Sequence, residues 1–136
     1  MAAAFNWSDR YSVNIAELDQ QHQRLFRLMD ELNRAVAAGR GQTALDEILR
    51  KLVEYTIVHF ATEEHLMDQH GFPGFSTHRF EHNVLTEKIT SLRLQHRAGK
   101  PDVAAALVLF LQHWLEEHIL KTDKQYSQFL NAKGVF

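Results

Sequence analysis

Two pairs of residues that can bind a metal ion stand close together in the middle of the chain, in the stretch HFATEEHLMDQHGFPGFSTHRFEH at residues 59–82. His59 and Glu63 form the first pair, and His78 and His82 form the second. A spacing of four places both side chains of a pair on one face of a helix, one turn apart. The Gly-Phe-Pro-Gly sequence between the pairs predicts a break, so each pair is expected on its own helix.

The length and composition predict one soluble globular domain, residues 1–136, with its own core. The chain is 45% hydrophobic and 24% charged, and its formal charge is −2 with no basic run, which predicts neither a nucleic-acid partner nor electrostatic binding to a membrane. No uninterrupted apolar run is long enough for a membrane span, and no signal-peptide pattern begins the chain, so we expect a cytoplasmic protein. Because the chain has no cysteine, a metal site would use nitrogen and oxygen ligands, and nine histidines are available.

The hydrophobic pattern predicts four helices joined by short connections. Apolar residues recur every three or four positions, glycines follow the first three periodic segments, and Pro101 suits the first turn of the fourth helix. An N-terminal extended arm at residues 1–16 carries Phe5, Trp7, Tyr11 and Ile15 as expected anchors. The expected helices cover residues 17–38, 43–70, 74–98 and 101–121, followed by a tail at 122–136 with one short helical piece around 125–130.

Short connections make neighbouring helices antiparallel, so the predicted fold is all-α: an up-down-up-down four-helix bundle with an N-terminal arm. In this topology the starts of the first and third helices lie beside the ends of the second and fourth. The polar residues that interrupt the apolar stripes fall at these positions, and they are His22, His59, Glu63, His78, His82 and His118. Asp123 follows His118 by five residues, and a turn where the fourth helix ends would bring its carboxylate inward.

Five imidazoles and two carboxylates are costly to bury as free groups, and bound metal removes that cost. Seven protein ligands and an exogenous molecule exceed what one six-coordinate ion accepts. Two octahedral ions, bridged by both carboxylates and one solvent-derived oxygen, would leave one of twelve positions open for a single small ligand. The ligand set favours iron or manganese, with zinc possible.

The other histidines have ordinary interpretations. His65, His70 and His113 are expected at the surface or the rim. His96 falls on the apolar stripe at the far end of the third helix, where an imidazole can cap the helix and interact with its dipole. A partly exposed polar pair at i, i+4 is the ordinary alternative for the first pair, but seven such residues meeting at one end of a bundle favour a metal site.

These residues resemble the hemerythrin family, specifically its single-domain bacterial members. The resemblance spans nearly the whole chain, and the order His, HxxxE, HxxxH, HxxxxD is highly specific although each element alone is weak. The chain departs from the family at Asn14, where Gly is frequent, and at Phe72, where Tyr is frequent. The matching segments are FNW at 5–7, LDQQHQRL at 18–25, HFATEEHLM at 59–67, HRFEH at 78–82 and HWLEEHILKTD at 113–123.

The resemblance implies a non-heme di-iron centre, in which two iron ions share an oxo or hydroxo bridge. One iron would be bound by His78, His82 and His118. The other would be bound by His22 and His59, with Glu63 and Asp123 bridging the two ions. The iron with two histidines would then have the open position for O2.

The resemblance also implies a small, dry O2 pocket. Trp114 and Leu115 match the family's pocket-lining aromatic residue and its gating leucine. Phe60 and Ile119, each next to a ligand, are expected either to line the pocket or to pack in the core. Tyr126 either donates a hydrogen bond beside the metal or only fixes the tail.

Reversible O2 binding, for oxygen storage, transport or delivery to oxygen-consuming enzymes, is the function that the resemblance implies, in a monomer that is not an enzyme. One alternative is a di-iron redox protein that handles peroxide, NO or iron. Another is an iron or zinc store, or a purely structural metal bundle. Ferritin-like di-iron enzymes use four carboxylates and two ExxH motifs, so a set of five histidines and two carboxylates favours binding over O2 activation.

Overall fold

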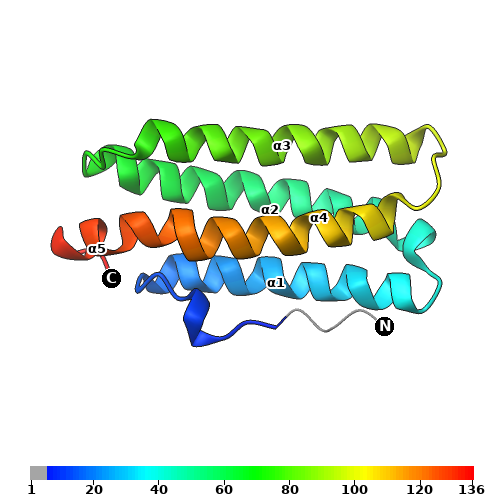
Figure 1. Cartoon of the computed structure of the whole chain (residues 1–136), viewed down its shortest axis with the longest axis horizontal. Helices are drawn as coiled ribbons and strands as arrows, with labels where there is room; N and C mark the ends of the chain where they lie inside the picture. Colours follow the sequence, from blue (N-terminus) through cyan, green and yellow to red (C-terminus); the bar gives the residue numbers. More distant parts are fainter. Residues whose placement is uncertain (1–5) are drawn as a thin grey trace.

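Four long helices lie antiparallel, each beside its sequence neighbour, in the computed structural model, which describes residues 6–136 (Figure 1). A six-residue π-helix, η2 (His118–Asp123), joins the fourth helix directly to α5 (Lys124–Ala132), and a short 3-10 helix, η1 (Asp9–Tyr11), lies in the arm. The long helices are α1 (Ala16–Ala37), α2 (Gly41–Gln69), α3 (Phe75–Arg97) and α4 (Val103–Glu117). The predicted all-α, up-down-up-down bundle is confirmed.

Glycines make the connections between the helices short. Gly71 follows α2 with φ +70°, and the N–H of Phe72 donates to the carbonyl of Met67 at 2.9 Å, which closes the helix end. Gly39 ends α1 in the same way, with φ +72°. Because glycine adopts this left-handed conformation without steric cost, the chain reverses within a few residues, and the next helix must run antiparallel.

The fourth helix differs from the prediction at both of its ends. Pro101 was expected in its first turn, but Asp102 takes a left-handed φ of 63° and the helix begins at Val103. We expected the helix to end at residue 121, but η2 carries it into α5 without a break. Tyr126 and Leu130 of α5 are fully buried because a second small core forms at this end of the bundle, together with Val13, Ile15, Leu18 and Met67.

The N-terminal arm packs along α1. Tyr11 is buried and Trp7 is half-buried, and both rings contact the ring of Phe26 at centroid distances of 4.8 and 5.5 Å. Ile15 is buried as well. Phe5, the other expected anchor, lies outside the described residues.

The turn before α1 accommodates Asn14 at the position where the family frequently has glycine. Asn14 has φ 60°, a left-handed conformation that glycine adopts freely and that asparagine tolerates better than most other residues. The carboxylate of Asp19 accepts hydrogen bonds from the N–H of Val13 at 2.8 Å and from the hydroxyl of Ser12 at 2.5 Å. The first turn of α1 is therefore fixed to the arm, just before the position of His22.

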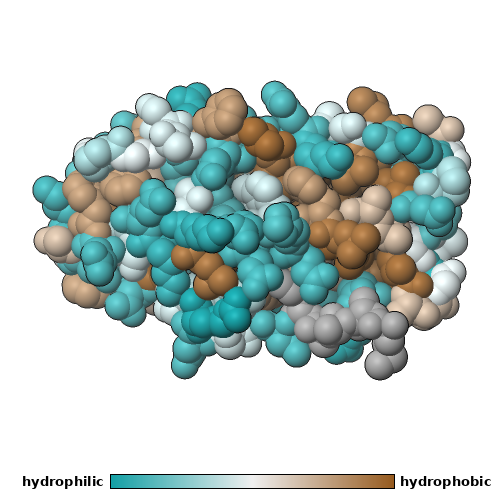
Figure 2. Space-filling model, viewed as in Figure 1, coloured by the Kyte–Doolittle hydropathy of each residue, from teal (hydrophilic) through white to brown (hydrophobic). Residues whose placement is uncertain are grey.

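The segment Val103–Ala132 is long enough to cross a membrane, and an 18-residue window within it reaches a mean hydropathy of 1.2. In the structure it comprises α4, η2 and α5, and its apolar residues Leu107, Val108 and Leu111 belong to the main core of the bundle. It also carries two of the seven candidate ligands. Figure 2 shows the face over α3 and α4, where polar residues are mixed with apolar ones along the length of the molecule. The segment is a core helix of the bundle.

Candidate metal centre

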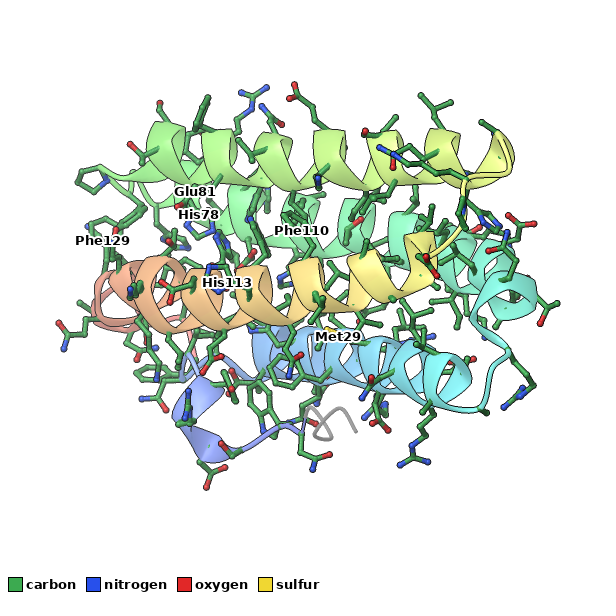
Figure 3. All side chains as sticks on the ribbon, turned by 45° about the vertical axis from the view of Figure 1, so that its right-hand side comes forward. Met29, His78, Glu81, Phe110, His113 and Phe129 are labelled. Carbon is green, nitrogen blue, oxygen red and sulfur yellow. The ribbon has the colours of Figure 1, made fainter. Side chains whose placement is uncertain are left out.

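All seven predicted ligands lie at one end of the bundle, and none is more than 5% exposed. The start of α1, the end of α2, the start of α3 and the end of α4 meet at this end, beside α5 (Figure 1). Figure 3 shows His78 pointing from α3 into the space between the helices. The seven side chains are His22 from α1, His59 and Glu63 from α2, His78 and His82 from α3, and His118 and Asp123 at the two ends of η2.

The π-helix brings His118 and Asp123 to one face. Along a regular α-helix, residues five apart differ in direction by about 140°. A π turn closes over five residues, so His118 and Asp123 lie one above the other, with 2.9 Å between His118 Nε2 and Asp123 Oδ1. The sequence predicted that a turn at a helix end would aim Asp123 inward. The structure does this inside a continuous helix.

The five histidines form two sets, His22 and His59 in one and His78, His82 and His118 in the other. The carboxylate of Asp123 lies between these two sets. Its Oδ1 is 3.0 Å from Nε2 of His78 and 2.9 Å from Nε2 of His118. Its Oδ2 is 3.1 Å from Nε2 of His22. One oxygen therefore faces each set, which is the arrangement that a bridging carboxylate requires.

Glu63 also contacts both sets. Its Oε1 lies 3.1 Å from Nε2 of His59 and 3.2 Å from Nε2 of His82. Its Oε2 accepts a hydrogen bond from the hydroxyl of Tyr126. Of the two roles considered for Tyr126, the structure therefore supports the hydrogen bond beside the site, and burial of the same ring in α5 fixes the tail as well.

The metal-free site is held together by charge. Burial would lower the pKa of His22, but the contacts with Asp123 and Glu63 raise it to about 9, and the same contacts raise the pKa of His78 to about 10. Burial would raise the pKa values of both carboxyl groups, but the surrounding imidazoles hold the pKa of Glu63 and that of Asp123 well below their usual ranges. The carboxylates are ionised at neutral pH, and protons on His22 and His78 balance them.

Many buried polar atoms at this site make no aligned hydrogen bond, although several lie within 3.2 Å of a polar atom of another site residue. A buried polar atom without a partner costs free energy unless another group, such as a metal ion, satisfies it. These atoms are Nε2 of His22, His78, His82 and His118, Oε1 of Glu63, and both oxygens of Asp123.

The geometry fits two metal ions. The candidate ligand atoms form two groups, and within each group all the atoms lie within 4.8 Å of one another, close enough to bind one metal ion. The two groups share Glu63 and Asp123. The groups are Glu63, His78, His82, His118 and Asp123, and His22, His59, Glu63 and Asp123.

A small cavity lies against the two-histidine side of the site. Its accessible volume is about 10 Å³, close to the minimum that one water-sized molecule needs. His22 and His59 both line it, whereas His78 and His82 do not. All four predicted pocket residues line the cavity: Phe60, Trp114, Leu115 and Ile119.

The prediction missed five further lining residues. Each stands three or seven positions from a ligand on the same helix, so helical spacing from the ligands would have found them. All except the threonine are apolar, and the threonine hydroxyl of Thr56 donates to the carbonyl of Val53 at 3.0 Å. The five are Leu25, Leu52, Thr56, Leu85 and Leu111.

Trp114 separates this cavity from the surface. Together with His118 it lines both the inner cavity and an outer hollow of about 230 Å³. The indole of Trp114 stacks on the imidazole of His118, with ring centroids 4.2 Å apart. Phe60 stacks on His82 in the same way, at 3.7 Å. Aromatic rings therefore cover one face of each of these imidazoles.

The outer nitrogens of three site histidines contact polar side chains that the prediction did not include. Nδ1 of His59 lies 2.8 Å from the amide oxygen of Gln21, and Nδ1 of His82 lies 2.9 Å from the carboxylate of Glu64. Nδ1 of His118 lies 3.3 Å from the carboxylate of Glu81. All three partners directly precede or follow a ligand in the sequence, at residues 21, 64 and 81, which is the signal that would have indicated them.

The remaining histidines lie elsewhere. His65 and His113 are exposed and His70 is half-buried. His96 is 8% exposed in the last turn of α3, at the opposite end of the bundle. Its Nε2 lies 3.2 Å from the carboxylate of Asp46, so His96 joins α3 to α2 there.

Most of the chain matches one protein family. The profile described as "Hemerythrin HHE cation binding domain" matches residues 13–130. The chain belongs to the hemerythrin family. The resemblance noted in the sequence is thus confirmed.

Individual hemerythrins match along most of their length. The bacteriohemerythrin of Stenotrophomonas maltophilia is 32% identical over 126 residues, which cover 93% of this chain and 81% of that protein. The bacteriohemerythrin of Methylococcus capsulatus is 30% identical over 131 residues, covering 96% and 99%. The crystal structure of a wild-type hemerythrin superposes with a TM-score of 0.86 at 29% identity, covering 94% of this chain and 98% of that one.

The pKa values of His22 and His78 predict how the stability of the metal-free protein depends on pH. A folded-state pKa above the ordinary value of 6.5 adds stability that is fully present below pH 6.5 and is lost as pH rises through the folded pKa. With values of about 9 and 10, the free energy of unfolding should fall between pH 6.5 and 10, by on the order of 3 to 5 kcal/mol for each of the two histidines. Thermal denaturation of chelator-treated protein at pH 6.5, 8 and 9.5 measures this.

The zinc-loaded protein is the control for this titration. Metal ligation keeps the imidazoles deprotonated at every pH in the series, so its melting temperature should change much less over the same range. A melting temperature of the metal-free protein that stays constant or rises toward pH 9.5 would contradict the charge balance described above.

Proposed function

We propose that this chain binds O2 reversibly at a di-iron centre and serves as an oxygen store or carrier. The observation that carries the proposal is the convergence of five imidazole nitrogens and two shared carboxylates beside a cavity for one small molecule. Membership of the hemerythrin family supports it, as do the relatives named bacteriohemerythrin.

The ligand assignment follows the two groups of atoms. His78, His82 and His118 would hold one iron, and His22 and His59 would hold the other. Glu63 and Asp123 would hold both. Two ferrous ions supply electrons to O2 when bound, and the position with fewer histidines supplies the open coordination site.

The protein's own part is to admit O2 and exclude water. Leu115 is 5% exposed and Ile119 is 1% exposed, and with Phe60 they give the cavity an apolar wall. Such a wall offers water few hydrogen bonds, so a dry cavity is favoured. The cavity adjoins His22 and His59, so a small molecule that enters it arrives at the position with the open coordination site.

The ligand set favours a carrier over an enzyme. Di-iron enzymes of the ferritin-like class use four carboxylates, whereas this site has two carboxylates and five imidazoles. A redox protein that handles peroxide, NO or iron is the alternative function, and a metal store is a further one. Both remain as outcomes of the first experiment below.

The cellular setting is part of the proposal. The composition, with a formal charge of −2 and no basic run, supports a protein that does not bind nucleic acid, and we propose that it is a cytoplasmic monomer. Its partner would be O2 itself, with delivery to an oxygen-consuming enzyme as the proposed use.

The first experiment is anaerobic loading with Fe(II), followed by an iron count and the visible spectrum before and after air is admitted. We expect two irons per chain and an absorption band that appears with O2 and disappears when O2 is removed. Two irons with immediate conversion to a stable diferric spectrum would favour the redox protein or the store. One iron per chain, or none, would overturn the ligand assignment.

Leu115→Ala should shorten the lifetime of the oxygenated protein several-fold. The smaller side chain enlarges the cavity and lets water reach the site, which promotes irreversible oxidation of the iron. The decay of the visible band in air-saturated buffer gives the rate. The matched control is Leu107→Ala, because Leu107 is a fully buried leucine of the same helix that does not line the cavity. Equal lifetimes for the two variants would count against a gating role for Leu115.

His118→Ala should lose iron and stability together. The variant removes one candidate ligand and leaves Asp123 buried with fewer partners, which costs about 3–5 kcal/mol for a broken buried ion pair. Iron per chain should fall below two, and the melting temperature should fall with it. His96→Ala truncates a buried histidine at the other end of the bundle and should keep both irons. A full iron content in the His118→Ala variant would show that His118 is not a ligand.

A further inference from the structure

The two sets of histidines differ in the groups that hold their outer ring nitrogens. His59, from the two-histidine set, contacts the neutral amide of Gln21 at 2.8 Å. His82, from the three-histidine set, contacts the carboxylate of Glu64 at 2.9 Å. The distances are nearly equal, so the main difference between the two contacts is the charge of the acceptor.

The hydrogen bonds around Gln21 fix the direction of its amide. The hydroxyl of Thr62 donates to the carbonyl of Val58 at 2.9 Å, so the oxygen of Thr62 is left to accept. The Gln21 atom that faces Thr62, at 3.3 Å, is therefore the donor Nε2. The amide oxygen then faces Nδ1 of His59, which must carry the proton, and the unprotonated Nε2 of His59 faces the site.

Glu64 fixes His82 in the same tautomer, but with a charge. A carboxylate only accepts, so Nδ1 of His82 carries the proton and its Nε2 faces the site. The Glu64 side chain is 25% exposed, and its second oxygen lies 3.8 Å from Nε of Arg79, a solvent-exposed side chain. The carboxylate of Glu81 lies 3.3 Å from Nδ1 of His118, so the three-histidine set has a second acidic neighbour, although this contact is not aligned as a hydrogen bond.

We propose that Glu64 and Gln21 make the two iron positions unequal in reduction potential. A carboxylate that accepts the outer N–H makes an imidazole more basic, and so a stronger donor to the metal, than an amide does. Stronger donation favours loss of one electron from Fe(II) to give Fe(III). The three-histidine position is then the easier one to oxidise, and the position beside the cavity keeps its ferrous state longer. This inference rests on the di-iron function proposed above.

The test exchanges the two acceptors without removing either. Glu64→Gln and Gln21→Glu keep the side-chain length and the hydrogen bond from the imidazole while changing the charge, and Gln21→Glu gives up the bond from Nε2 to Thr62. Anaerobic redox titration of the iron-loaded protein, with chemical mediators, gives the two midpoint potentials. Glu64→Gln should raise the lower potential by about a tenfold change in the redox equilibrium, which is about 59 mV for one electron. Gln21→Glu should lower the higher potential by a similar amount.

The control for net charge is Glu47→Gln, on the same helix as Glu64. Glu47 pairs with Arg50 on the surface, and its neutralisation should leave both potentials unchanged. Melting temperature and iron count establish that each variant is folded and loaded. A separate readout uses zinc, which has no redox chemistry: Glu64→Gln should weaken zinc binding about tenfold, and Glu47→Gln should not.

The outcomes separate this inference from the proposed function. Two irons with unequal potentials that respond to the exchanges, in a protein that binds no O2, would support the inference and overturn the carrier function. Reversible O2 binding, with redox equilibria in both exchange variants that differ less than about twofold from wild type (about 18 mV for one electron), would overturn the inference and leave the carrier function intact. A wild-type protein that takes up no iron would overturn both.

Discussion

Two ionised carboxylates surrounded by imidazoles, all removed from water, form the constraint on which the rest of this structure depends. Glu63 and Asp123 have no exposed surface, and burial of a charge is tolerated only with partners that neutralise it. In the metal-free protein, protons on His22 and His78 provide that neutralisation. Metal ions would replace those protons, and would also satisfy the nitrogens and oxygens that lack hydrogen-bond partners. Metal binding and stability are therefore linked at one end of the bundle.

The architecture concentrates its irregular features at that end. The far end is an ordinary helical bundle closed by glycine turns and by the contact between His96 and Asp46. The site end has the π-helix η2, the additional helix α5 and the second small core around Tyr126. These features fix the carboxylate of Asp123 in direction and that of Glu63 through its hydrogen bond from Tyr126. Rigid placement of both carboxylates lets five histidines from four helical segments face the same point.

The two halves of the site have different surroundings. The two-histidine half has a cavity bounded by apolar side chains and a neutral amide behind His59. The three-histidine half has aromatic rings stacked on His82 and His118, and carboxylates behind both of these imidazoles. One half is thus arranged to receive a small apolar molecule, and the other has more acidic side chains around it. This asymmetry suits a centre in which one metal position binds a ligand and the other remains fully coordinated.

The sequence by itself determined the fold, the family and the convergence of the seven side chains. Periodic apolar residues and glycine breaks are local signals, and the antiparallel rule places His22, His59, His78 and His118 at one end without any coordinates. The family resemblance predicted Trp114 and Leu115 as pocket residues, and adjacency to a ligand suggested Phe60 and Ile119. What the tertiary structure decided depends on contacts between segments that local signals do not encode. The π-helix that turns Asp123 inward, and the contacts of Gln21 with His59 and of Glu64 with His82 between neighbouring helices, follow from how the helices pack against one another. Sequence spacing defines the face on which a side chain lies, but only packing across helices defines which atom it meets.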